Sequence, residues 1–218
     1  RLQKGLMQQL LTGRLKPAGS LRSQDEFTEH PKLGLVPRDW LCAKGRQVFR
    51  LHSGYAPEAL TFTAPNNDGD CLLMKVDDFN HPSNRIAIKA TAQSLNLGER
   101  MKDFDACQAG CLVIAKRGAA ITHNRVRLLS RPTLLDPNLM GIEMLNGHLP
   151  EFFRHLLTYL NLSRFLEVSS VPQLNNKDLY PRWFAMPQRD EQEDILRVLD
   201  SVEHLIEAKH TKIAALQR

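Results

Sequence analysis

The stretch DEQEDILRVLDSVEHLIEAKHTKIAALQR, residues 190–218, constrains the fold more than any other part of the sequence. Its apolar positions are separated by steps that alternate between four and three residues, which is the spacing of a coiled-coil seam. The seam consists of Ile195, Leu199, Val202, Ile206, Lys209, Ile213 and Leu216. A polar seam position such as Lys209 costs stability but can fix the register. We therefore predict one long helix, roughly 40 Å in length at a rise of about 1.5 Å per residue.

Two details refine this prediction. Asp190 is expected to cap the helix N-terminus, with Glu193 as its capping-box partner. Leu205 widens the apolar face. An amphipathic helix folded back on its own domain remains the alternative, although the length of the pattern favours a coiled coil.

Residues 1–15, RLQKGLMQQLLTGRL, predict a second helix of similar character. An apolar face recurs every four residues, at Leu2, Leu6 and Leu10. Gly13 and Pro17 then end the pattern. Residues 18–35 are polar and are expected to form a connector. Both ends of the chain thus carry helices suited to packing against other helices.

Short apolar runs alternate with Gly, Pro, Asn and Asp clusters from residue 36 to 146, which predicts a β-rich core. The candidate strands are Gln47–His52, Leu60–Thr63, Cys71–Val76, Arg85–Ala90, Cys111–Lys116, Arg125–Leu129 and Gly141–Leu145. Helical spacing returns over residues 149–166, and a last strand is expected over residues 179–187. The predicted class is α+β. Its expected segments are a conserved helix piece at 1–17, a β-rich domain at 18–188 and the long helix at 189–218.

Composition favours a polyanionic partner. The 218 residues carry a net charge of +5, and 42% of them are apolar, so a packed core with a basic surface is expected, or simply a soluble basic domain. No apolar run is long enough to span a membrane, and no signal peptide opens the sequence. Among the four cysteines, Cys107 and Cys111 could hold a metal with His123. Reduced, partly buried thiols in a cytoplasmic protein are the favoured interpretation.

An ordered set of short motifs resembles one half of the DNA-specificity (S) subunit of type I restriction–modification systems. The N-terminal segment 2–13 and the C-terminal segment 212–217 resemble consecutive parts of that family's conserved helix. Between them, in the family's order, lie Trp40, Phe49, Leu51–Pro57, Leu73–Phe79, Gly110–Ala119, Val171–Asn175, Asp178, Leu179, Pro187, Glu191 and Gln192. The chain departs from the family in its terminal arrangement and in having one recognition domain where complete subunits have two. It resembles a repeat unit cut within its conserved helix, or the second half of a longer subunit.

This resemblance implies a target recognition domain that reads half of a bipartite site in duplex DNA. It also implies a protein without chemistry of its own, which docks an adenine-methylating modification subunit and, through the complex, a restriction subunit. S-adenosylmethionine, ATP and Mg²⁺ are then expected on those partners, and no metal or cofactor on this chain. A lone half would borrow its second helix from another copy, so a homodimer on a symmetric, interrupted target is expected.

Lysine, arginine, asparagine and tyrosine side chains on strands and turns are the candidate DNA contacts. They are Lys44, Arg46, Tyr55, Lys75, Asn80, Arg85, Lys89, Lys116, Arg117, Asn124, Arg125 and Arg127. Arg125 and Arg127 lie two residues apart, so they share one face of a strand. Each residue could instead be an ordinary solvated side chain, and Arg117, beside Gly118, could hold a turn.

Two other classes of function were weighed. A methyltransferase would need an Asn/Asp-Pro-Pro-aromatic motif, and the nearest string, residues 136–139, lacks the second proline and the aromatic residue. A metal nuclease would need clustered carboxylates, and Asp70, Asp77 and Asp78 around Lys75 are the candidates. A coiled-coil scaffold without specific DNA binding is the remaining alternative.

Overall fold

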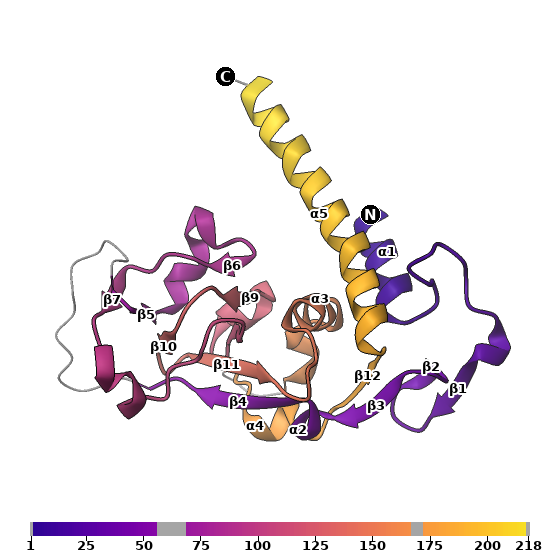
Figure 1. The fold of residues 1–218 in the computed structure, drawn as a ribbon, viewed down its shortest axis with the longest axis horizontal. Coiled ribbons are helices and arrows are strands. Elements are labelled where there is room, and N and C mark those ends of the chain that lie inside the picture. The colour runs from indigo at the N-terminus through magenta and orange to yellow at the C-terminus, as the bar shows by residue number, and fades with distance from the viewer. Residues whose placement is uncertain (1, 56–68, 167–171, 217–218) are drawn as a thin grey trace. The chain divides into compact units, whose positions relative to one another are not determined.

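The computed structural model describes residues 2–55, 69–166 and 172–216, with side chains at 4–55, 69–166 and 172–205. The described chain is a mixture of helices and short strands, which confirms the α+β class (Figure 1). It divides into two compact units, the first formed by Arg1–Ala43 with Trp183–Arg218 and the second by Lys44–Arg182. The division into segments 1–17, 18–188 and 189–218, which was expected from the sequence, remains a prediction.

The first unit joins the two ends of the sequence. Helix α1 (Leu2–Leu11) lies beside helix α5 (Arg189–Leu216) (Figure 1). A hairpin of β1 (Phe27–His30) and β2 (Gly34–Pro37) follows the 3-10 turn η1 (Gln24–Glu26), and β3 (Leu41–Lys44) pairs with β12 (Trp183–Met186). Gly13 ends α1 as predicted. Its φ of +68° is left-handed, and a Cβ there would lie 2.3 Å from Cγ of Pro37.

Two local predictions in this unit were wrong. The expected connector contains the β1–β2 hairpin, whose strands bury little beyond Val36 and Pro37, so they lack the apolar alternation that would have revealed them. Asp190 is not the helix cap, because α5 begins at Arg189 and Asp190 lies inside the first turn. Its carboxylate still faces the positive end of the helix dipole. Glu193 instead accepts a hydrogen bond from Nε of Arg189 at 3.1 Å.

A buried ion pair fastens α5 to the N-terminal segment within this unit. The side chain of Arg22 is 3% exposed and donates to Oε1 of Glu191 at 2.8 Å and to the carbonyl oxygen of Gly13 at 2.9 Å. Nε1 of Trp40 donates to the other oxygen of Glu191 at 3.1 Å. One carboxylate in the first turn of α5 therefore satisfies two buried donors from the N-terminal segment.

The second unit is built on two sheets. The five-stranded sheet has the order β4-β11-β8-β9-β6, and the three-stranded sheet has the order β10-β5-β7. The strands are β4 (Phe49–Ser53), β5 (Cys71–Met74), β6 (Ala87–Ile88), β7 (Gln93–Leu95), β8 (Leu112–Ala115), β9 (Val126–Leu129), β10 (Thr133–Leu135) and β11 (Leu139–Met144). Helix α3 (Pro150–Leu160) packs against β9 and buries Phe152, Phe153 and Leu157 (Figure 1).

Short helical pieces connect these strands. They are α2 (Gly45–Val48), η2 (Val76–Asn80), η3 (Pro82–Asn84), η4 (Gly98–Asp103), η5 (Ala119–His123), η6 (Leu162–Phe165) and α4 (Asn176–Leu179). Within residues 2–55, 69–166 and 172–216, no helix has the length and apolar character needed to cross a membrane.

The predicted strands are confirmed for β5, β8, β9 and β11, and in β5 and β8 the apolar run is continuous and buried. The strand expected from Gln47 begins only at Phe49, because Gly45–Val48 form a helical turn. The strand expected over residues 85–90 shortens to β6. The last strand shortens to β12, and α4 precedes it. The expected strand Leu60–Thr63 lies outside the described residues.

The buried pair yields a stability prediction. Glu191→Ala leaves the Arg22 guanidinium and the Trp40 N–H without their main acceptor, so it should lower the free energy of unfolding of the first unit by about 2–4 kcal/mol. The matched control Glu193→Ala, on the same helix but in an exposed pair, should cost about 0.5 kcal/mol or less. Both tryptophans, Trp40 and Trp183, lie in the first unit, so denaturant unfolding followed by tryptophan fluorescence measures it alone. Equal losses in the two variants would contradict the role assigned to Glu191.

Candidate nucleic-acid interface

The register of the second unit brings most candidate contacts to one end of its large sheet. Ala115 pairs with Leu139 and Ile114 with Val126, so β8 ends where β11 and β9 begin. Strand β4 ends at the same level, because Ser53 pairs with Met140. Strand β6 runs parallel to β9 and pairs with it from Leu128 onward, and Arg85 precedes β6 by two residues. The residues at these strand ends are Tyr55, Arg85, Lys116, Arg117, Asn124 and Arg125.

The smaller sheet adds two more candidates to this end. Strand β5 runs parallel to β10, and the N–H of Asp136 donates to the carbonyl of Met74 at 3.0 Å, just before β11 begins. Lys75 therefore leaves β5 beside the start of β11. Asn80 reaches the same place through its contact with Arg125. We call this set the basic end; it comprises Lys75, Asn80, Arg85, Lys116, Arg117, Asn124 and Arg125, with Tyr55 at its margin.

The remaining candidates lie elsewhere in the unit. Lys44 and Arg46 precede and lie in α2, before the first residue of β4, which is the opposite end of the sheet. Lys89 follows β6, and Arg127 lies in the middle of β9. The structure thus does not gather all twelve candidates into one surface.

Two buried polar residues that the sequence analysis did not identify as structural hold the loop between β5 and β7. Asn84 is fully buried; its Nδ2 donates to the carbonyls of Asp78 and Ala90, and its Oδ1 accepts from the N–H groups of Lys89 and Ala90. Asp78 accepts from the N–H groups of Lys75 and Ala92 at 2.7 and 2.9 Å. These bonds fix the loop backbone that carries the exposed side chains of the basic end. The only sequence signal was a pair of polar residues in a turn-rich segment.

Arg125, which precedes β9, and Arg127, which lies within it, contact this loop differently. Nη1 of the half-buried Arg125 donates to Oδ1 of the exposed Asn80 at 2.7 Å. Nε of Arg127 donates to the carbonyl of Asn84 at 2.9 Å, and its Nη1 donates to the carbonyl of Val126 at 3.0 Å. The Arg127 guanidinium therefore binds backbone carbonyls, whereas the Arg125 guanidinium is held by the side chain of Asn80.

Three other candidates have mixed surroundings. Asn124 has a left-handed φ of +50°, and its amide bonds the carbonyl of Thr158 and the N–H of Leu162, so it has a structural role. Lys116 is buried; burial and the nearby charge of Arg117 lower its pKa. Arg117 is exposed and its backbone bridges to Gln173, in keeping with the turn-holding alternative.

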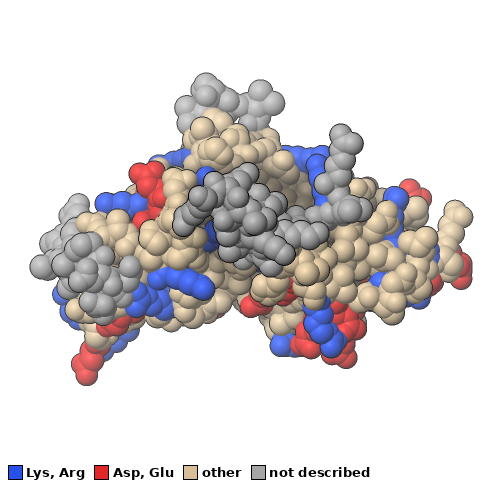
Figure 2. All heavy atoms as spheres, turned by 90° about the horizontal axis from the view of Figure 1, so that it is seen from above, with Lys and Arg blue, Asp and Glu red and all other residues tan. Residues whose placement is uncertain are grey.

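The positive charge of the chain belongs mostly to the second unit. That unit has 17 Lys and Arg against 13 Asp and Glu, a balance of +4 out of +5, while the first unit has 12 against 11. On the face shown in Figure 2, lysine and arginine atoms form several separate groups with acidic atoms among them. Attraction to a polyanion therefore rests on local clusters such as the basic end.

The carboxylates considered for a nuclease have structural partners. Asp70 accepts from the N–H groups of Leu97 and Gly98 at 2.8 and 2.6 Å. Asp78 holds the loop described above, and Asp77 is exposed. Backbone capping accounts for two of the three carboxylates, so this triplet gives no support to metal-dependent cleavage.

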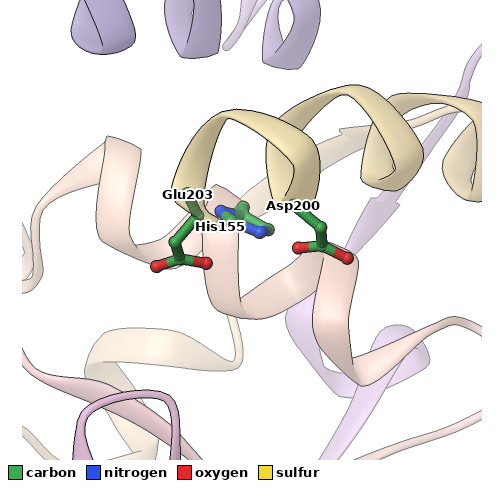
Figure 3. Close-up of side chains that lie close together, drawn as sticks. All are labelled: His155, Asp200 and Glu203. Atoms are coloured by element: carbon green, nitrogen blue, oxygen red, sulfur yellow. The ribbon is translucent and has the colours of Figure 1, made fainter. Parts of the chain in front are cut away.

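The thiol–histidine set suggested by the sequence is not brought together. Cys111 lies before β8 and His123 lies before β9, at opposite ends of an antiparallel pair, and all four thiols are free. His155 on α3 and the carboxylates of Asp200 and Glu203 on α5 are drawn in Figure 3. The histidine belongs to the second unit and the carboxylates to the first. Two carboxylates three residues apart on one helix do not by themselves define a metal site.

One histidine in the second unit is held between two carboxylates. Nδ1 of His52 lies 3.0 Å from Asp105, and Nε2 lies 3.0 Å from Glu143, which Arg50 also contacts at 3.4 Å. Burial opposes the charge of the imidazole, but the hydrogen bonds with Glu143 and Asp105 outweigh burial and raise the pKa of His52. The protonated ring thus ties β4 to β11 and to the segment before β8.

No protein-family model matches the chain. The HsdS subunit from Thermoanaerobacter tengcongensis aligns with 94% of this chain and 44% of its own length, at 18% identity and a TM-score of 0.63. A chain described under "Structural basis underlying complex assembly and conformational transition of the type I R-M system" aligns with 99% and 48%, at 15% identity and a TM-score of 0.67. The S subunit of a type I restriction–modification system from M. genitalium aligns with 92% and 45%, at 12% identity and a TM-score of 0.54.

These similarities show that the chain shares the fold of type I specificity subunits, as its motifs predicted. The chain spans less than half the length of each of these solved structures. The shared fold therefore corresponds to one portion of such a subunit.

The histidine clamp yields a pH prediction. Because the pKa of His52 is higher in the folded state, its stabilising contribution is complete below about pH 6.5, the pKa expected in the unfolded chain. It is lost as the pH rises through the raised folded value. His52→Gln should therefore flatten the fall in stability above that pH, as measured by thermal unfolding followed by circular dichroism. An NMR titration of the His52 ring giving a pKa at or below the usual value would contradict this assignment.

Proposed function

We propose that this chain is a sequence-specific DNA recognition module of a type I restriction–modification complex and reads one half of a bipartite target. The observation that carries the proposal is the basic end. Strands from two sheets meet there. They present Lys75 and Arg85 from a loop braced by buried polar residues, and Arg117 and Arg125 from the segment between β8 and β9. Cationic side chains on loops bind phosphates, and their neighbours reach base edges. The fold shared with specificity subunits supports the same reading.

The proposed module performs no chemistry itself. It would position an adenine-methylating modification subunit on DNA, and a restriction subunit through the complex. S-adenosylmethionine, ATP and Mg²⁺ would belong to those partners. The four free thiols suit a reducing compartment, so the cytoplasm is the proposed place of action.

Helix α5 supplies the proposed assembly element, and its seam has two parts. Ile195 and Leu199 are buried within the chain, and Leu10 of α1 is buried in the same unit. Val202 is half-buried and Leu205 is 63% exposed. We therefore assign pairing with a second copy to the helix from Val202 onward. Leu2, Ile206, Lys209, Ile213 and Leu216 have side chains outside the described residues, and Leu6 is half-buried on α1.

DNA binding should depend steeply on salt. Four to five cations at the basic end predict a slope of log affinity against log salt of about −3 to −5 on a random duplex. Lys75→Ala should reduce the magnitude of that slope by about one, while Lys44→Ala, at the opposite end of the sheet, should leave it unchanged. Fluorescence anisotropy between low and physiological salt measures both. Salt-independent or absent binding by the wild-type chain would favour the scaffold alternative.

The oligomeric state should follow the exposed part of the helix. Multi-angle light scattering should give twice the 24.8 kDa mass of the chain. Leu205→Glu should shift the protein to the monomer, since it places a charge on the apolar face, whereas Ser201→Glu on the same helix should not. A wild-type monomer that still binds the modification subunit would indicate a piece of a two-domain subunit that reads an asymmetric site.

A further inference from the structure

We infer that Arg125 and Asn80 form a base-reading pair that selects guanine in the major groove. This inference rests on the proposed DNA recognition and goes beyond it, because it names the base and the atoms that would read it. The observation behind it is the hydrogen bond of 2.7 Å from Nη1 of Arg125 to Oδ1 of Asn80, a solvent-exposed bond at the basic end between a half-buried arginine and an exposed asparagine.

The chemistry of the pair leaves it with mainly donors to offer. A guanidinium carries only donors, so the amide atom that faces it must be the oxygen. Arg125 therefore uses one of the two lone pairs of the Asn80 oxygen, and the Nδ2 group of Asn80 and the other N–H groups of Arg125 are donors. The fork of Arg125 keeps its other N–H groups on the same positively charged plane.

A pair that offers mainly donors matches one base edge best. Guanine presents two acceptors, N7 and O6, in the major groove, whereas adenine presents an acceptor beside an amino donor and cytosine presents an amino donor. An unpaired asparagine would read adenine with its oxygen and its amide nitrogen together. In this structure the oxygen already accepts from Arg125, which disfavours that two-point contact and favours guanine.

The backbone on both sides of the pair is fixed before any ligand arrives. Asn80 ends η2, and the carboxylate of Asp78 within η2 accepts from the N–H groups of Lys75 and Ala92. Arg125 adjoins β9 and the left-handed Asn124, whose amide is bonded to Thr158 and Leu162. A side chain held in place loses less conformational entropy on binding, which favours a specific contact over a loose phosphate contact.

The neighbouring Arg127, which lies within β9, provides a contrast. Arg127 directs Nε and Nη1 to backbone carbonyls at 2.9 and 3.0 Å, so its guanidinium lies against the protein. Nη1 of Arg125 instead donates to the amide oxygen of the exposed Asn80 side chain. A solvent-exposed hydrogen bond between side chains contributes little to folding, so variants of the pair should remain folded.

The test is selection of random-sequence duplexes by the full chain, followed by sequencing of the bound pool. The wild-type protein should enrich a motif that contains a guanine lost in Arg125→Lys. Discrimination at that one position should fall roughly five- to 150-fold, while the other positions persist. Asn80→Ala should weaken the same position without changing the salt slope, since no charge is removed. The matched control Arg50→Lys, an exposed arginine bonded to Glu143, should leave the motif intact.

The outcomes separate the inference from the proposal beneath it. If Arg125→Lys and Asn80→Ala enrich the same motif as the wild-type chain, guanine included, the base assignment is overturned. The proposed DNA recognition then still stands. A motif in which the affected position is adenine also overturns the base assignment. Failure of the wild-type chain to enrich any motif overturns the proposed sequence recognition, and the guanine assignment with it. Thermal unfolding of each variant confirms that a changed motif reflects contact and not loss of fold.

Discussion

The first unit depends on the buried contact between Arg22 and Glu191. It joins residues 169 positions apart, and with Trp40 it fixes the start of α5 against the N-terminal segment. A guanidinium that is 3% exposed is tolerated only because Glu191 and the carbonyl of Gly13 satisfy it. Gln192 adds a buried bond from Nε2 to the carbonyl of Pro187 at 2.9 Å. Pro187, Glu191 and Gln192, which the sequence analysis noted only as part of a family resemblance, thus help to fix the start of α5 against the N-terminal segment.

The helices and the continuous apolar strands could be predicted because their signals are local. The spacing in α3 and α5, Gly13 after α1 and the buried runs of β5 and β8 each follow from neighbours in the sequence. The β1–β2 hairpin and the four-residue α2 gave no such signal, since their burial depends on distant residues. Gly54 is another residue whose structural role could not be predicted from its neighbours in the sequence. A Cβ there would lie 1.8 Å from the carbonyl oxygen of Asp136, a constraint that only the folded chain reveals.

The candidate interface was predictable in its residue types and not in its arrangement. Lysines, arginines and asparagines near turns could be named, but their convergence at one end requires the antiparallel register of β8, β9 and β11 and the parallel register of β6 with β9. Asp78 and Asn84 are the structural residues that the sequence analysis did not identify. Their role is to satisfy backbone groups in a loop of irregular structure, which no periodicity records. Asn124, in contrast, was a candidate DNA contact and has a structural role, because its amide bonds the backbone of Thr158 and Leu162.

Under the proposed function, the uneven distribution of charge between the two units bears on how the DNA target of such a chain could change. The second unit holds nearly all the positive balance, while the first unit is close to neutral and is built from α1, α5 and short strand pairs. The exposed side chains on the loop between β5 and β7 depend on Asp78 and Asn84 for the position of their backbone. Under the proposed function, substitutions at exposed positions such as Lys75 or Asn80 would therefore alter the basic end at little cost to folding. The Arg22–Glu191 contact lies in the other unit, so under the proposed function recognition can diversify while assembly is retained.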